Sequence, residues 1–202
     1  PTDGFDFALL EFSTPVDYNI TRYEAYAENS ELGKESIKVG YGKSGYGANG
    51  ATLGSGTRRA GKNSYDMTAT ALNSIGFFVN NGYAQLAYDF DSGDAQYDAM
   101  GYIPLNGFVA NPSLTLGFGD DEVGSAPGDS GGPTFIDNKI AGITSYGFGF
   151  SGDPDISPGT NNSWGEIAVD GRVSSIVDWL DEHEALDPIP EPGTIILLPI
   201  AA

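Results

Sequence analysis

Apolar residues in this chain occur in short runs, separated by segments rich in Gly, Pro, Asn, Asp and Ser. This pattern is typical of many short strands joined by turns. It predicts strands at 5–12, 35–42, 64–72 and 83–90, two more in a hairpin over 131–147, and a last one at 163–169. The hairpin is expected to turn at Asp137-Asn138.

Helical periodicity is convincing in one place, near the C-terminus. The segment SSIVDWLDEHEAL places Ile176, Trp179, Leu180 and His183 at i, i+3, i+4 and i+7, which is the apolar stripe of a helix. Two segments read as loops: 42–61, which holds seven glycines, and the polar stretch 153–163. Six strands over 35–185 followed by one helix predict a small closed antiparallel barrel, and hence an all-β fold.

Composition narrows the possible functions. The 202 residues are 40% hydrophobic and 18% charged, which is the composition of a globular protein of one domain or two small ones. The net charge of −19 repels phosphate backbones and anionic lipids, so it argues against nucleic-acid binding. Cysteine is absent, which excludes disulfides and thiolate metal sites.

The hexapeptide GDSGGP, residues 128–133, carries the strongest chemical signal. Its glycines permit a tight turn in which the backbone N–H groups of Gly128 and Ser130 point at one spot. Such a pair can hold the oxyanion that forms when the Ser130 hydroxyl attacks a carbonyl. A side chain at position 128 would crowd the substrate. The alternative interpretation is an ordinary Gly/Asp/Ser turn between strands.

Three further segments accompany this motif: FDFALLEF (5–12), IAGITSYG (140–147) and RVSSIVDWL (172–180). Together with GDSGGP they resemble the trypsin/chymotrypsin family of serine peptidases. The resemblance implies a trypsin-like double β-barrel with the site between the barrels. Residues 1–187 would supply the last strand of the first barrel, at 5–12, all of the second barrel, and the C-terminal helix.

The same resemblance assigns roles to individual residues. Asp6 would be the acid of a catalytic triad and Ser130 its nucleophile, with the Gly128 and Ser130 amides as the oxyanion hole. Asp129 would form a buried ion pair with the mature N-terminus. The substrate would lie along Ser145, Tyr146 and Gly147. The pocket floor falls on Gly124, where the trypsin branch has an aspartate, so a pocket for small or apolar side chains is expected.

The triad lacks its base within this sequence. In the family a histidine precedes the aspartate by tens of residues, but here five residues precede Asp6 and the single histidine is His183 in the predicted helix. We therefore expect a fragment of a longer serine endopeptidase that acts on proteins or peptides, and an isolated chain that is inactive. A protease-like surface protein that binds a peptide or glycan, and a base from another subunit, remain alternatives.

Two other motifs are weaker. GYGKSG (40–45) mimics a dinucleotide fingerprint, but the segment after it will not form the helix that holds the phosphates. DFDSGD (89–94) hints at calcium but fails the calcium-loop spacing, so a solvated acidic turn is expected. Neither a metal nor an organic cofactor is predicted.

The C-terminal segment PEPGTIILLPIAA (190–202) resembles the start of the PEP-CTERM sorting signal of bacterial envelope proteins. The resemblance implies that 188–202 are a shortened sorting tail, that the protein is secreted or held at the bacterial cell envelope, and that an exosortase processes it. The nine residues after Gly193 are too few to span a bilayer.

Overall fold

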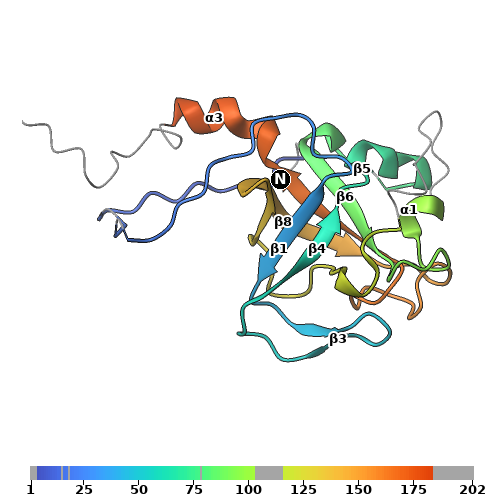
Figure 1. Cartoon of the computed structure of the whole chain (residues 1–202). Coiled ribbons are helices and arrows are strands. Elements are labelled where there is room, and N and C mark those ends of the chain that lie inside the picture. Colours follow the sequence, from blue (N-terminus) through green and yellow to red (C-terminus); the bar gives the residue numbers. More distant parts are fainter. Residues whose placement is uncertain (1–3, 15, 18, 78, 103–115, 184–202) are drawn as a thin grey trace, which may run out of the picture.

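A curled antiparallel sheet forms the body of the protein in the computed structural model, which describes residues 4–14, 16–17, 19–77, 79–102 and 116–183 (Figure 1). Seven strands lie in the order β4-β1-β7-β8-β9-β6-β5. Their bounds are β1 (Glu35–Gly40), β4 (Arg59–Ser64), β5 (Met67–Thr68), β6 (Gln85–Phe90), β7 (Pro133–Ile136), β8 (Lys139–Phe148) and β9 (Glu166–Arg172). A separate hairpin pairs β2 (Ser44–Tyr46) with β3 (Gly50–Leu53).

The sheet closes on itself at one corner. Strands β4 and β5 stand at opposite ends of the strand order, yet only Tyr65 and Asp66 separate them along the chain. The corner is tied to β6 by hydrogen bonds from the Asp66 amide to the Ala87 carbonyl and from the Asn63 side chain to the Asp89 carbonyl. The predicted antiparallel β fold is therefore confirmed in part, as a curled antiparallel sheet.

Two apolar clusters fill the curled sheet. One gathers small and flexible side chains of β5, β6, β9 and the helical turns beside them: Met67, Ala69, Leu72, Ala87, Ala99, Met100, Ile167 and Val169. The other is richer in aromatic rings: Tyr26, Tyr65, Leu86, Tyr88, Ile136, Ala141 and Ala168. Because side chains alternate along a strand, neighbouring positions of β6 serve different clusters, with Ala87 in one and Leu86 and Tyr88 in the other.

Short helical turns connect and finish the strands. They are η1 (Ala69–Ile75), η2 (Gly82–Ala84), α1 (Ala99–Tyr102), η3 (Gly119–Asp121) and, after β9, η4 (Val173–Ile176) running into α3 (Val177–Glu182). The terminal helix is therefore present where its apolar stripe predicted it. None of the helices in the described part of the chain is long and apolar enough to cross a membrane.

The hairpin prediction is confirmed, including its turn. Asp137 and Asn138 join β7 to β8 with φ values of 50° and 66°, the left-handed pair that suits a two-residue hairpin. The strands predicted at 35–42, 83–90 and 163–169 correspond to β1, β6 and β9.

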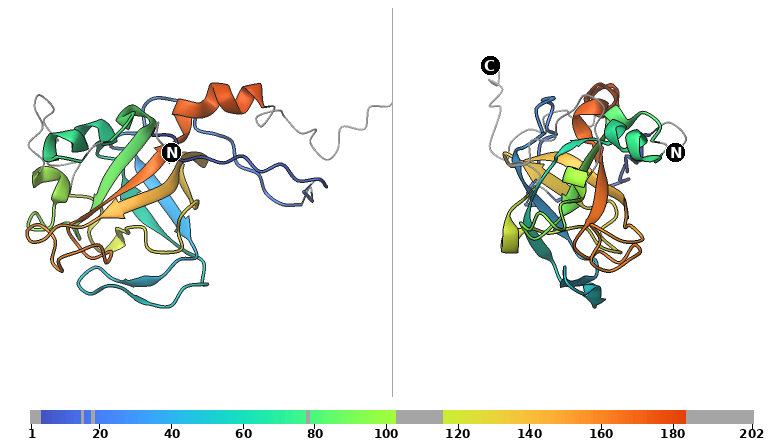
Figure 2. Two further views of the ribbon diagram at one scale, coloured as in Figure 1. Left: turned by 180° about the vertical axis from the view of Figure 1, so that it is seen from behind. Right: turned by 90° about the vertical axis from the view of Figure 1, so that its right-hand side faces the viewer.

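The predicted strand at 5–12 is wrong. These residues have no strand geometry, and Leu10 and Phe12 are 74% and 67% exposed. In Figures 1 and 2 the N-terminal segment reaches out from the sheet on the side of α3. A strand needs a neighbour to take its N–H and C=O groups, and in the described part of the chain no strand pairs with this segment.

Two further predictions need correction. The predicted strand at 64–72 is reduced to the two residues of β5, because the chain turns into η1 at Ala69. The glycine-rich segment 42–61 is not a plain loop. It forms the β2–β3 hairpin and the start of β4, and the Ala51 amide of that hairpin is held by the Asn161 carbonyl.

Candidate active site

The turn that carries Ser130 lies just before β7, and both Ser130 and Gly128 are exposed. Gly128 has φ +99°, and a Cβ atom there would lie 3.1 Å from the Cα atom of Gly42. The position therefore requires glycine for two reasons: the backbone is left-handed, and it lies close to the loop after β1.

Amide groups alternate along this turn between bonded and free. The amides of Asp129, Gly131 and Gly132 donate to the carbonyls of Ala126, Thr144 and Asp129. Those of Gly128 and Ser130 donate to no group in the described part of the chain. These are the two N–H groups that the sequence predicted for an oxyanion hole, and the structure leaves both available.

The Asp129 carboxylate fixes the turn from behind. Its two oxygens accept hydrogen bonds from the Gly42 amide (2.7 Å) and the Ala126 amide (2.9 Å). The loop after β1 and the segment before the nucleophile are therefore joined through one side chain. The ion pair between Asp129 and a mature N-terminus stays a prediction, because residues 1–3 lie outside the described residues.

Asp6 is anchored to β8 by a serine. The Ser145 hydroxyl donates to the Asp6 carboxylate with Oγ–Oδ2 2.6 Å. Two neighbouring contacts hold the same segment in place: the Gln85 side chain donates to the Gly4 carbonyl (2.8 Å), and the Phe7 ring lies against Gly171 of β9. Asp6 is therefore positioned although its segment forms no strand.

The segments that carry Asp6 and Ser130 are bound to neighbouring residues of β8. The residue after Ser130, Gly131, donates its amide to the Thr144 carbonyl, and the residue after Thr144 is the Ser145 that binds Asp6. Ser145 is the extra residue of a β-bulge, since the pairing of β8 with β9 shifts register between Thr144 and Tyr146. Bulges re-aim side chains beside active sites. The chain segments of the predicted acid and nucleophile are thus both attached to this part of β8.

The predicted substrate edge continues this region. Tyr146 and Gly147 are exposed on β8 directly after Ser145. The Tyr146 hydroxyl donates to the Gln85 side chain (2.8 Å), and the same amide group binds Gly4. One side chain therefore links the edge of β8 to the segment that carries Asp6.

Gly124 lies at the wall of two cavities. The larger, of about 220 Å³, runs from Gly124 past Asp129 to the β2–β3 hairpin and Lys38. The smaller, of about 10 Å³, lies between Gly124, Gly147 and Glu166, and the Phe90 ring is 3.3 Å from the place of a Cβ on Gly124. The expected apolar pocket is thus largely closed by Phe90, and burial raises the pKa of Glu166 at its inner wall.

His183 has no part in this arrangement. It is exposed at the end of α3, its Nδ1 lies 2.8 Å from the Trp179 carbonyl, and its ring packs beside the Trp179 ring. The Ser130 hydroxyl has no hydrogen-bond partner among the described residues. The sequence interpretation of His183 as a residue of the terminal helix, and not a base, fits these contacts.

Sequence reasoning missed the environment of 89–94. The expected solvated acidic turn holds only for the exposed Asp94, because Asp89 and Asp91 are 2% and 0% exposed. Their carboxylates form a buried cluster with that of Asp98. The local sequence suggests a surface turn, and only the chain's return at Asp98 and Glu122 buries it.

Three comparisons place this geometry among known proteins. No protein-family model matches the sequence. Trypsin 5G1 of Aedes aegypti is 32% identical over 85 residues, which cover 42% of this chain and 27% of the mosquito protein. The structure is similar to that of neuropsin, a serine protease expressed in the limbic system of mouse brain, with a TM-score of 0.53 and 12% identity.

The structural match covers 86% of this chain and 58% of the neuropsin chain. The chain thus spans about a quarter of the mosquito relative and somewhat more than half of the mouse structure. At 12% identity the structural likeness concerns the fold. The chain therefore has the trypsin-like serine protease fold.

Proposed function

We propose that this chain supplies the nucleophile, the oxyanion hole and the orienting acid of a serine endopeptidase. Ser130 attacks the carbonyl carbon of a peptide bond while a histidine from outside the printed sequence takes its proton. The same histidine returns the proton to the leaving amine, and water then hydrolyses the acyl-enzyme on Ser130. Asp6 holds that histidine in the productive orientation.

The observation that carries the proposal is that Asp6 and the turn of Ser130 are bound by neighbouring residues of β8, Ser145 and Thr144. Asp6 is bound by the Ser145 hydroxyl, and the turn of Ser130 is bound by the Thr144 carbonyl. The free amides of Gly128 and Ser130 add donors for a developing oxyanion. In serine proteases, each such donor contributes about 3 kcal/mol to transition-state stabilisation.

The substrates we propose are proteins or peptides whose backbone lies along Ser145–Gly147. The side chain before the scissile bond would enter beside Gly124. The Phe90 ring restricts that space, so a small residue fits this position better than a lysine or arginine. A peptide library profiled with the active full-length protein would test this preference.

Activity-based labelling tests the proposed nucleophile. The full-length protein encoded by the gene is treated with a fluorophosphonate, which reacts with an activated serine. We expect labelling of the wild type and of His183→Gln, and none of Ser130→Ala. The 202-residue chain alone is expected to stay unlabelled, because its single histidine, His183, lies at the end of α3 against Trp179.

The outcomes separate the two candidate functions. Equal labelling of Ser130→Ala and wild type would refute the nucleophile. A full-length protein that folds, retains Ser130 and yet is never labelled would instead favour a protease-like protein that binds a peptide or glycan without cleaving it.

We further propose export to the bacterial cell envelope, on the resemblance of 190–202 to a sorting signal. These residues lie outside the described part of the chain. Fractionation of the native bacterium tests the idea. A full-length protein found in the cytoplasm alone would contradict both export and processing by an exosortase.

A further inference from the structure

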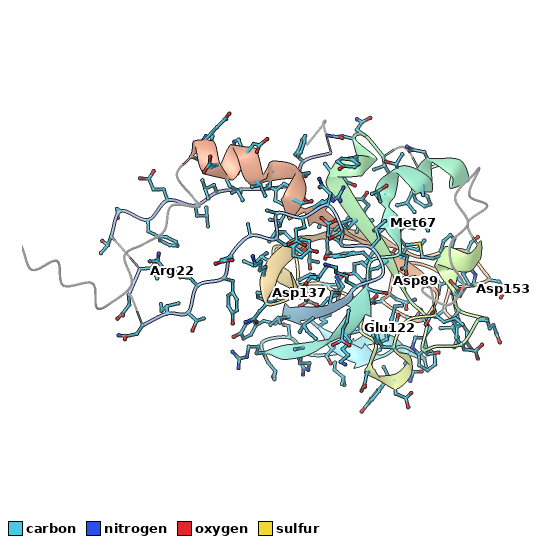
Figure 3. All side chains as sticks on the ribbon, turned by 45° about the horizontal axis from the view of Figure 1, so that its top comes forward. Arg22, Met67, Asp89, Glu122, Asp137 and Asp153 are labelled. Carbon is cyan, nitrogen blue, oxygen red and sulfur yellow. The ribbon has the colours of Figure 1, made fainter. Side chains whose placement is uncertain are left out.

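Three buried carboxylates meet at the end of β6. Asp89, Asp91 and Asp98 are 2%, 0% and 7% exposed, and each places one carboxylate oxygen within 4.8 Å of those of the other two. We call these three residues the aspartate cluster. Asp89 lies on β6, with Glu122 nearby on the segment after η3 (Figure 3).

Backbone amides hold each carboxylate of the cluster by one oxygen. Asp89 Oδ2 accepts from the Met100 amide (2.8 Å), Asp91 Oδ1 from the Gly93 amide (2.7 Å) and Asp98 Oδ1 from the Gly101 amide (2.6 Å). The orientation of all three groups is therefore set by the surrounding chain.

The second oxygen of Asp91 is the most informative atom. Asp91 Oδ2 is fully buried and has no hydrogen-bond partner among the residues that the structure describes. A buried carboxylate oxygen without a partner costs free energy, so native structures satisfy such an atom with a donor, a water or a cation. The neighbours of Asp91 are themselves carboxylates. The group that satisfies Asp91 Oδ2 must therefore be one that negative charge attracts, such as a cation.

The electrostatic environment strengthens this requirement. In the described part of the chain no lysine, arginine or histidine forms an ion pair with Asp89, Asp91 or Glu122. The negative charge is thus concentrated where water cannot screen it.

We propose that the aspartate cluster binds one calcium ion. Ca²⁺ takes oxygen ligands at about 2.3–2.6 Å, so oxygens on one ion lie up to about 5 Å apart, which matches the spacing of the cluster. Mg²⁺ requires a tighter octahedron and retains more water, and Zn²⁺ prefers nitrogen and sulfur ligands. The site does not follow the contiguous calcium-loop spacing, because Asp98 joins it from beyond the turn.

The ion would also organise the approach to the candidate active site. Glu122 accepts hydrogen bonds from the amides of Asp91 (3.2 Å) and Phe118 (2.9 Å). Two residues later the chain reaches Gly124, and then the turn of Ser130. Calcium would therefore stabilise the wall of the substrate pocket from behind. The inference itself does not depend on peptidase activity.

Binding is tested on the 202-residue chain with metal alone. Tb³⁺ replaces Ca²⁺ in oxygen sites and emits when excited through a nearby aromatic ring. Tyr97 precedes Asp98 and stacks on Trp164 with 5.6 Å between ring centroids, so it provides that antenna. We expect sensitised Tb³⁺ emission that millimolar Ca²⁺ displaces and equal Mg²⁺ does not. We also expect Ca²⁺ to raise the midpoint of thermal unfolding by several degrees over EDTA.

The variant Asp91→Asn tests whether Asp91 binds calcium or only supports the fold. The asparagine keeps an oxygen for the Gly93 amide but removes one charge. We expect at least tenfold weaker Ca²⁺ binding, together with stability in EDTA equal to or above that of wild type. Asp121→Asn is the matched control, since it removes the same charge from an exposed position next to Glu122 and is expected to bind Ca²⁺ like wild type.

The proposal is overturned if wild type shows no displaceable Tb³⁺ emission and no Ca²⁺-dependent stabilisation. It is also overturned if Asp91→Asn binds Ca²⁺ as tightly as wild type. In either case a proton shared between Asp91 and Glu122 would be the better account of the cluster. Should Asp91→Asn fail to fold, the wild-type displacement and melting measurements still decide.

Discussion

The hydroxyl of Ser145 donates a hydrogen bond of 2.6 Å to the carboxylate of Asp6, although the two residues lie 139 positions apart. Ser145 is presented by the bulge in β8, and Asp6 by a segment without regular structure. The hydrogen bond therefore does what strand pairing does not: it fixes the position of the carboxylate. Its loss should affect the proposed chemistry more than the fold.

Ser145→Ala tests that role in the full-length protein. With one donor fewer the carboxylate of Asp6 is less well oriented, so we expect the rate of fluorophosphonate labelling to fall about tenfold, equivalent to about 1.4 kcal/mol. More of its negative charge then faces the histidine, so the acid limb of the labelling rate moves to higher pH.

The exposed Ser151→Ala is the control and should leave both the rate and the pH profile unchanged. An unchanged pH profile for Ser145→Ala, with labelling as fast as wild type, would remove Ser145 from the site. A parallel loss of thermal stability and rate would indicate a purely structural role.

Replacing glycines by alanine distinguishes two causes of lost stability: strain in a left-handed backbone and crowding by neighbouring atoms. Gly128 has a positive φ and a close neighbour, Gly131 has a positive φ in open space, and Gly152 has neither. We expect Gly128→Ala to cost the most stability, Gly131→Ala about 1–2 kcal/mol, and Gly152→Ala nearly nothing. Labelling of the full-length protein should fall at least tenfold for Gly128→Ala, because the methyl group adjoins the proposed oxyanion site. Urea unfolding of the three variants provides the stability ranking, and a reversed order would contradict the geometry.

Local signals in the sequence predicted the parts of the fold that local physics determines. Asp137-Asn138 tolerates left-handed backbone, and the hairpin turns there. Gly128 and Gly131 permit the turn that frees two amides. The apolar run 83–90 became β6, since it is buried along almost its whole length. In each case the residues whose type predicts a turn or a strand are the same residues that form it.

The remaining features depend on partners that are distant in sequence. Residues 5–12 have strand composition but pair with no strand in the described part of the chain. Asp89 and Asp91 sit in a segment with turn-like composition, and the return of the chain at Asp98 buries them. The bond between Ser145 and Asp6 was not predicted either, although the resemblance had placed both residues near the site.

A buried ion pair joins the end of β9 to the segment before β1. Arg172 binds both carboxylate oxygens of Glu31, at 2.9 and 2.6 Å, and the Ser174 hydroxyl donates to the same group. Burial alone would raise the pKa of Glu31, but these donors outweigh it and lower that pKa below its usual value of 4.5. We expect Glu31→Gln to reduce the free energy of unfolding by about 3 kcal/mol at pH 7.

The sign of the pKa shift predicts how this loss depends on pH. A carboxylate with a lowered pKa in the folded state stabilises the fold above its unfolded pKa and loses that contribution as pH falls through the folded value. The difference between wild type and Glu31→Gln should therefore shrink below about pH 4.5. Urea titrations at pH 7, 5 and 3.5 measure it, with the exposed Glu28→Gln as control. A difference that grows on acidification would contradict the assignment.

Lys38 and Asp170 form a second buried pair inside the sheet. Lys38 Nζ lies 2.8 Å from Asp170 Oδ2 and 3.5 Å from the centre of the Tyr88 ring, while Tyr65 and Thr134 donate to the same oxygen. Burial lowers the pKa of Lys38, and the nearby Asp170 opposes that shift. Removing either charge leaves the other uncompensated in the interior, which costs about 3–5 kcal/mol.

A double-mutant cycle with Lys38→Met and Asp170→Asn should therefore show strong coupling. The methionine keeps the length of the apolar stem, and the asparagine keeps an acceptor for Tyr65 and Thr134. We expect the double variant to be at least about 2 kcal/mol more stable than the sum of the single losses predicts. The exposed pair Lys62–Glu35, at 3.0 Å, is the matched control, with Lys62→Met and Glu35→Gln expected to couple by less than about 1 kcal/mol. Equal coupling in the two cycles, measured by urea unfolding, would mean that the interior pair is as well solvated as the surface pair.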